Sequence, residues 1–140
     1  MPVLALDVGE RRIGLAVSDP GETFALPLRV LDRTNLRDDL AAIVAVAGEH
    51  GARTIVVGDP LRLSGERGPA AEKIDRFCEA LARTFDGAIE RVDERLTTAQ
   101  ATRVLIDADV SRAKRKRVVD GMAAALILET YLGRRRAARG

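Results

Sequence analysis

The sequence predicts an α/β domain with a mixed β-sheet, and three observations predict it. Three apolar segments follow one another near the start, and the short turns between them favour an antiparallel meander. Beyond them, segments with helical apolar spacing alternate with short β-branched segments, as helices and strands alternate around parallel sheets. No repeat, linker or low-complexity stretch divides the 140 residues. We therefore expect a single domain over residues 1–140.

The meander is expected to consist of strands at residues 3–8, 12–18 and 24–31. Turns at Gly9-Glu10-Arg11 and Pro20-Gly21-Glu22 separate these strands, and both contain residues that favour turns. Each strand can therefore pair with the one before it.

The first helix is expected from Asn35 onward, where apolar residues recur with a helical period and Thr34 or Asn35 can supply the N-cap. Residues 54–58 are uniformly apolar or β-branched, as buried parallel strands are. A second helix follows Pro69, and residues 88–92 form a fifth strand. The apolar stripe of this second helix contains Ile74, Phe77, Cys78, Leu81 and Phe85.

The last part of the chain is predicted to be mainly helical. Thr97 and Gln100 can form a capping box that opens a third helix. Residues 108–117 are polar and basic and are expected to form a loop. A final helix is expected at roughly 117–132, followed by a basic tail at about 133–140.

The loop after the fourth strand has two possible roles. It contains three glycines together with the cations Arg62 and Arg67. It is either a phosphate-contacting loop or an ordinary surface loop that ends where Pro69 begins a helix. The spacing alone does not decide between these roles.

Composition narrows the class of protein. Hydrophobic residues make up 46% of the chain and charged residues 31%, which is typical of a soluble globular protein. No apolar run is long enough to span a bilayer and no secretory signal is visible, so we expect a cytoplasmic protein. Cys78 is the only cysteine, which excludes an intramolecular disulfide and a cysteine-rich zinc site, and it is expected in the core. His50, the only histidine, is expected at a helix end without a catalytic role.

Charge is distributed unevenly along the chain. Residues 111–140 carry nine Lys and Arg against two acids, whereas residues 1–110 carry fourteen basic and nineteen acidic side chains. This asymmetry favours a polyanionic partner for the basic surface, although a basic tail can also serve solubility alone.

Acidic residues lie where predicted strands end and where the last helix begins. Asp7 ends the first strand, Asp93 and Glu94 follow the fifth strand, and Asp120 is in the first turn of the last helix. Sites in open α/β sheets lie beyond the carboxyl ends of strands, so these acids could converge there. A charge at the end of an apolar strand is costly unless it is paired or binds a metal.

Such a cluster predicts a site for hard divalent cations, Mg²⁺ or Mn²⁺, and most simply for two ions. Two ions can activate a water molecule and stabilise the leaving oxygen of a phosphodiester. Each acid also has a simpler explanation. Asp7 could form a turn, one of the two acids after the fifth strand could pair with a neighbouring arginine, and Asp120 could be a favourable charge at a helix start. Jointly, these simpler explanations account for less of the pattern.

Four blocks of sequence cover nearly the whole chain. They are Leu6-Asp7-Val8-Gly9 with residues 12–19; Val56-Val57-Gly58-Asp59-Pro60-Leu61, continuing to Glu72; Asp93-Glu94-Arg95-Leu96-Thr97-Thr98; and Arg115-Lys116-Arg117-Val118-Val119-Asp120 with Ala123-Ala124. In this order the blocks resemble the motifs of the YqgF/RuvX family. Its members are Holliday-junction-resolvase-like nucleases of the ribonuclease H superfamily, also described as pre-16S ribosomal RNA nucleases. The chain departs from the family pattern at Arg62-Leu63-Ser64, where members more often carry an Asn-Met-Asp-like triplet.

The resemblance implies a ribonuclease H-like fold, with a mixed five-stranded sheet and helices on both faces. It also implies that Asp7, Glu94 and Asp120 are the catalytic carboxylates that hold divalent metal, with Asp93 as the alternative neighbour. We therefore expect a metal-dependent nuclease that processes the 5′ end of pre-16S ribosomal RNA. The residues expected to contact nucleic acid are Arg11, Arg12, Arg62, Arg67, Arg95, Arg115, Lys116 and Arg117.

Other functions remain open at this stage. The protein could be a resolvase-like DNA nuclease acting on branched DNA in recombination or repair. It could also be a non-catalytic factor that binds RNA on ribosomal particles. An actin-like nucleotide-binding module is disfavoured, because 140 residues cannot supply the second lobe that closes over a nucleotide. The sequence leaves open the choice between RNA and DNA, between endonuclease and exonuclease, between Mg²⁺ and Mn²⁺, and between monomer and homodimer.

Overall fold

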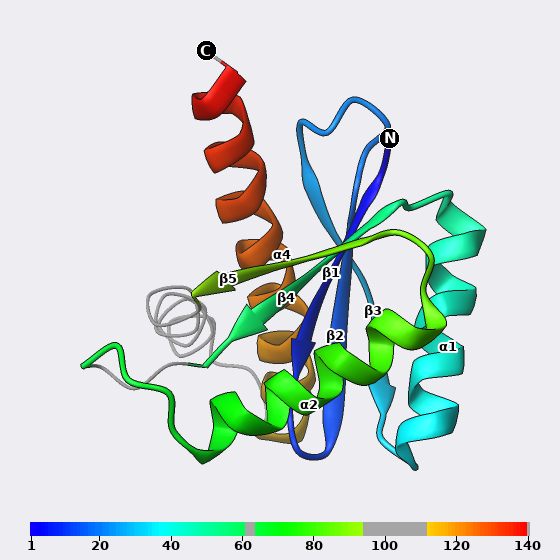
Figure 1. Cartoon of the computed structure of the whole chain (residues 1–140), viewed down its shortest axis with the longest axis vertical. Coiled ribbons are helices and arrows are strands. Elements are labelled where there is room, and N and C mark those ends of the chain that lie inside the picture. The colour runs from blue at the N-terminus through cyan, green and yellow to red at the C-terminus, as the bar shows by residue number, and fades with distance from the viewer. Residues whose placement is uncertain (61–63, 94–111, 140) are drawn as a thin grey trace.

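A five-stranded mixed sheet forms the centre of the molecule (Figure 1). The computed structural model describes the backbone of residues 1–60, 64–93 and 112–139, and their side chains except those of 112–121 and 139. The strands are β1 (Val3–Val8), β2 (Arg12–Ser18), β3 (Ala25–Asp32), β4 (Thr54–Asp59) and β5 (Ala88–Asp93). Their order across the sheet is β3-β2-β1-β4-β5.

The first three strands form the predicted antiparallel meander. β1 pairs with β2, and β2 pairs with β3, both in antiparallel register. β4 then pairs with β1, and β5 with β4, both in parallel register. The mixed sheet expected from the sequence is therefore confirmed, and the carboxyl ends of β1, β4 and β5 lie at the same edge.

Helices cover both faces of the sheet. The helices α1 (Leu36–His50) and α2 (Pro69–Thr84) cover one face, and α4 (Arg112–Arg139) crosses the other (Figure 1). Because side chains alternate along a strand, Leu4 and Leu6 of β1 face the α1–α2 layer, whereas Val3 and Ala5 face α4. Both sets are at most 1% exposed, so β1 is buried on both sides.

The ends of α1 agree with the sequence. Asn35 is the N-cap, and its side chain accepts a hydrogen bond from the backbone N–H of Asp38. His50 is the last helical residue, and Gly51 ends the helix in the left-handed region at φ 66°, where a glycine is least strained. Cys78 of α2 is buried in the core, as expected, and burial raises the pKa of its thiol.

The last helix is longer than the sequence predicts. We expected a helix at 117–132, a loop at 108–117 and a basic tail at 133–140, but α4 runs from Arg112 to Arg139. Gly133 lies within the helix because the alanines and arginines after it are strong helix formers. Contacts with the β2–β3 turn also hold this end: Arg135 pairs with Glu22, and Arg136 donates to the carbonyl of Thr23. The third helix expected after Thr97 lies outside the described residues.

Within the described residues, none of the helices combines the length and the apolar character needed to cross a membrane.

Candidate active site at the carboxyl edge of the sheet

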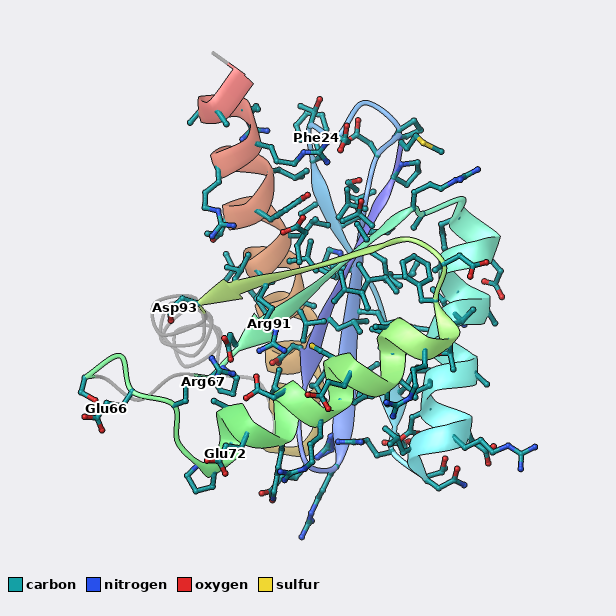
Figure 2. The ribbon with its side chains drawn as sticks, viewed as in Figure 1. Phe24, Glu66, Arg67, Glu72, Arg91 and Asp93 are labelled. Carbon is teal, nitrogen blue, oxygen red and sulfur yellow. The ribbon has the colours of Figure 1, made fainter. Side chains whose placement is uncertain are left out.

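Aspartates stand at the carboxyl ends of the three parallel strands. Asp7 is the penultimate residue of β1, and Asp59 and Asp93 are the last residues of β4 and β5. Figure 2 shows Asp93 at the tip of β5. The edge predicted to carry the site is therefore lined by acidic side chains, as the strand ends of an open α/β sheet allow.

Asp7 belongs to the face of the sheet that α4 covers. It follows Val3 and Ala5 at two-residue intervals, and both of these residues pack in the core beneath α4. The backbone position of Asp7 is directly opposite Gly14 of β2. Gly14 has no side chain to occupy the surface beside the carboxylate. Asp7 therefore lies on the α4 face of the sheet, beside a position on β2 that carries no side chain.

The other two predicted metal ligands are Asp120 of α4 and Glu94, which follows β5 in the sequence. Asp120 lies in the described backbone of α4, four residues before Ala124, which is fully buried in the same core cluster as Ala5. The side chain of Asp120 and the whole of Glu94 lie outside the described residues. In the described part of the chain, no group of three or more His, Cys, Asp and Glu residues could hold a metal ion. The convergence of Asp7, Glu94 and Asp120 thus stays a prediction.

Asp93 belongs to the opposite face from Asp7. It continues the alternation of Ile89, which packs on the α1–α2 core, and of Arg91, which pairs with Asp75 of α2. By contrast, Val92 packs in the core beneath α4. Asp93 is also directly opposite Asp59 in the parallel register. Its position therefore associates Asp93 with the α2 side of the edge.

An ionic network on that side was not predicted from the sequence. Arg67 forms a bidentate salt bridge with Asp59, in which Nη1 donates to Oδ2 at 2.8 Å and Nη2 donates to Oδ1 at 3.0 Å. Arg67 also donates to Asp75, from Nε to Oδ2 at 3.2 Å and from Nη2 to Oδ1 at 2.6 Å. Asp75 is in turn paired with Arg91. Figure 2 shows Arg67 and Arg91 between the end of the sheet and α2.

Hydrogen bonds in this network shift the pKa of its members. Arg91 and then Arg67 lower the pKa of Asp75, because both cations donate to its ionised carboxylate. Asp59 and Asp75 raise the pKa of Arg67, and Asp75 raises that of Arg91. No periodicity indicates this network, since its four members come from β4, the following loop, α2 and β5.

The predicted nucleic-acid contacts are distributed over several elements. Arg11 is exposed in the β1–β2 turn, and Arg12 is half-buried at the start of β2. Arg67 is engaged in the ionic network. Arg62 and Arg95 lie outside the described residues, as do the side chains of Arg115, Lys116 and Arg117, whose backbone begins α4.

A groove of about 600 Å³ lies beside the β1–β2 turn, on the α1–α2 side of the edge. Gly9 and Leu36 line it together with cations that the sequence analysis did not select, Arg33, Lys73 and Arg76. Lys73 and Arg76 are three residues apart on α2, a spacing that puts two side chains on one helix face and could have indicated them. Arg33 is paired with Asp39 at 3.2 Å, and Lys73 lies 3.7 Å from Glu10.

The sequence model of the RuvX family, described as Holliday junction resolvase, matches residues 1–134. The chain belongs to the RuvX family. A relative from Clostridium perfringens is 44% identical over 134 residues, which cover 96% of this chain and 98% of the relative. A relative from Symbiobacterium thermophilum is 46% identical over 137 residues, covering 98% and 95%. Both carry the name "Putative pre-16S rRNA nuclease".

Solved resolvases share the fold. Thermus thermophilus RuvC, in complex with a Holliday junction substrate, matches with a TM-score of 0.56 and 16% identity over 95% of this chain and 97% of that one. The Fowlpox virus resolvase, in complex with Holliday junction DNA, matches with a TM-score of 0.60 and 11% identity over the same shares. These likenesses confirm the ribonuclease H-like architecture expected from the sequence.

Membership of the RuvX family makes this protein a nuclease, an enzyme that hydrolyses phosphodiester bonds in nucleic acid. The acidic edge of the sheet offers carboxylate oxygens, the donors that Mg²⁺ and Mn²⁺ prefer.

Proposed function

We propose that this protein is a divalent-metal-dependent nuclease that processes the 5′ end of pre-16S ribosomal RNA, with Asp7, Glu94 and Asp120 as its metal ligands. The observation that carries the proposal is the position of Asp7. This carboxylate is next to the last residue of β1, on the sheet face that α4 covers, and a glycine is directly opposite it. The names of the relatives from Clostridium perfringens and Symbiobacterium thermophilum support pre-16S ribosomal RNA as the substrate.

The donor chemistry favours Mg²⁺ or Mn²⁺ over softer metals. The three proposed ligands offer carboxylate oxygens only, and the single cysteine lies in the core on the other side of the sheet. A pair of such ions, when bound, activates the attacking water and stabilises the leaving oxygen. Asp7 would anchor the metal, because it lies on the central strand of the sheet, on the face that α4 covers.

The alternation of β5 supports Glu94 rather than Asp93 as the second ligand. Val92 packs toward α4, as Asp7 does, whereas Arg91 pairs with α2. A period of two residues gives Asp93 the phase of Arg91, which disfavours Asp93 as a ligand on the α4 face.

We further propose that the phosphate backbone of the substrate crosses the β1–β2 turn and lies along the groove beside it. Exposed Arg11 stands at the turn, and Lys73 and Arg76 line the groove. Contacts from these cations to phosphates would provide affinity that is independent of sequence and falls with salt.

The test is a cleavage assay with purified wild type and Asp7→Asn on matched substrates. These are a 5′-extended 16S precursor RNA, a four-way DNA junction, and single-stranded DNA and RNA, each with Mg²⁺, Mn²⁺ or chelator. We expect metal-dependent cleavage of the precursor RNA by wild type and a loss of at least about 10³-fold in Asp7→Asn. Binding measured in chelator should be retained.

Asp86→Asn is the matched control, because Asp86 is exposed at the opposite edge of the sheet, before β5. It should cleave like wild type. Equal cleavage by Asp7→Asn and wild type, in preparations free of contaminating nuclease, would refute the metal site. Binding without product under every ion would instead indicate a non-catalytic RNA-binding factor.

A second candidate is a resolvase that acts on branched DNA. It is favoured by the fold shared with Thermus thermophilus RuvC and by the description of the family. Preferential, symmetric cleavage of the four-way junction in the same assay would select it over processing of ribosomal RNA.

A further inference from the structure

The guanidinium of Arg67 is occupied by protein acceptors. Its Nε and Nη1 donate to Asp75 and Asp59, and its Nη2 lies within hydrogen-bond distance of Asp59, Asp75 and the carbonyl of Ala71. A guanidinium has five N–H donors in a fixed plane. Almost all of this capacity is therefore used inside the protein, and little remains for a phosphate.

The contacts of Arg67 connect segments that surround the acidic edge. Asp59 ends β4, Arg67 is in the loop that follows, Asp75 is in the second turn of α2, and Arg91 precedes the end of β5 by two residues. We call these four residues the ionic latch. Its two carboxylates and two guanidiniums sum to no net charge, so the ionic latch adds no net attraction for a polyanion.

The latch also relieves two electrostatic costs. Asp59 is only 8% exposed, and a buried carboxylate without a partner is strongly destabilising. Asp59 is also directly opposite Asp93, and like charges at such positions repel one another. Arg67 at 2.8 Å and Arg91 at 4.0 Å from the Asp59 carboxylate compensate this local negative charge. The carboxyl ends of β4 and β5 can then lie side by side.

We propose that Arg67 is a positioning residue, which with Asp59, Asp75 and Arg91 fixes residues 64–68 and the end of β5 at the sheet edge that also carries Asp7. This gives Arg67 a different role from the phosphate contact expected from the sequence. The catalytic consequence rests on the proposed nuclease function, because the segment after β5 carries Glu94. The structural consequence, a fixed backbone at residues 64–68 and at the end of β5, is independent of that function.

Two substitutions distinguish positioning from phosphate contact. Arg67→Gln removes the central cation, and Asp75→Asn removes one of its acceptors at a half-exposed site. If Arg67 positions the edge, both substitutions should loosen residues 64–68 and the end of β5. If Arg67 contacts phosphate, Asp75→Asn frees the guanidinium and strengthens binding, whereas Arg67→Gln weakens it. Arg29→Gln is the control, because it breaks an exposed ion pair between Arg29 of β3 and Glu49 of α1.

Three readouts are measured: backbone hydrogen exchange in metal-free protein, the salt dependence of binding to single-stranded RNA in chelator, and kcat with KM. Both latch variants should speed exchange about tenfold or more at residues 64–68 and 89–93, with little change elsewhere. The salt slope should stay at the wild-type value. In an active enzyme kcat should fall about tenfold or more with KM nearly unchanged, since misplacement of reacting groups by about 1 Å costs up to about 100-fold. Arg29→Gln should match wild type.

Unchanged exchange at both segments would overturn the proposal. A second outcome would also overturn it. In Arg67→Gln the slope of log RNA affinity against log salt would fall by about 0.7, the value for one phosphate contact on a single strand, and Asp75→Asn would bind RNA more tightly. An inactive wild type would defeat the proposed function alone, because the exchange comparison in metal-free protein would still test the latch.

Discussion

Asp7 of β1 and Gly14 of β2 are direct partners in the antiparallel register. Side chains at such positions lie on the same face of the sheet, with Cβ atoms about 5 Å apart. Gly14 has no Cβ, so the carboxylate of Asp7 has no side-chain neighbour at the position across from it on β2.

We predict that Gly14→Val impairs metal binding. A valine at this position would place two methyl groups on the face where Asp7 is proposed to hold metal. Mn²⁺ affinity, measured by calorimetry, should fall about tenfold or more, which corresponds to about 1.4 kcal/mol. Gly48→Ala is the control for glycine replacement, because a Cβ there meets nothing within 4 Å. Equal Mn²⁺ affinity in Gly14→Val and wild type would contradict the prediction.

Substitutions after β5 should separate Glu94 from Asp93. Removing a metal-binding carboxylate should cost far more than removing one on the α2 side of the edge. We expect Glu94→Gln to lower kcat by at least about 100-fold and Asp93→Asn by less than about tenfold. Steady-state cleavage rates of the two variants provide the measurement. The reverse order of effects would reassign the ligand to Asp93.

Cations in the groove should affect how strongly RNA affinity depends on salt. If Lys73 and Arg76 contact phosphates, the double variant Lys73→Gln/Arg76→Gln should reduce the slope of log affinity against log salt by about 1.4 on single-stranded RNA. The control double variant Arg53→Gln/Arg83→Gln removes the same charge from exposed positions near the other end of α2. An equal reduction in both double variants would indicate a general effect of net charge rather than contacts in the groove.

Acid should weaken the ionic latch. Arg91 and Arg67 lower the pKa of Asp75 below its ordinary value of 3.8, so the folded state favours the ionised carboxylate. The corresponding stability is present above the unfolded pKa and is lost as pH falls through the folded pKa. The free energy of unfolding in urea should thus be higher for wild type than for Asp75→Asn at pH 7, and this difference should shrink toward pH 3. A difference that is constant with pH would contradict the assignment.

Much of the fold could be predicted because it depends on neighbours in sequence. The bounds expected for β1 and β2 match the structure; those for β4 and β5 differ by one residue at one end, and those for β3 by one residue at each end. Asn35 was one of two predicted N-caps, and Cys78 was predicted to be in the core. Apolar period, turn residues and capping residues act over a few positions, so the chain itself displays them.

The end of the last helix could not be predicted in the same way. Gly133 and the polar residues after it have no apolar stripe, and the sequence therefore indicated a tail. The helix continues to Arg139 because contacts from Arg135 and Arg136 reach the β2–β3 turn, more than a hundred residues earlier. No local pattern contains that information.

Patterns along the chain were sufficient to predict most strands and helices, the acidic residues at strand ends and, through four ordered motifs, the family. The folded arrangement was needed to see that Asp7 and Asp93 belong to opposite faces of the sheet and that two carboxylates bind Arg67. The physical reason is the range of the interactions. Hydrophobic period and capping act within one element, whereas the pairing of charges depends on which elements the sheet brings together.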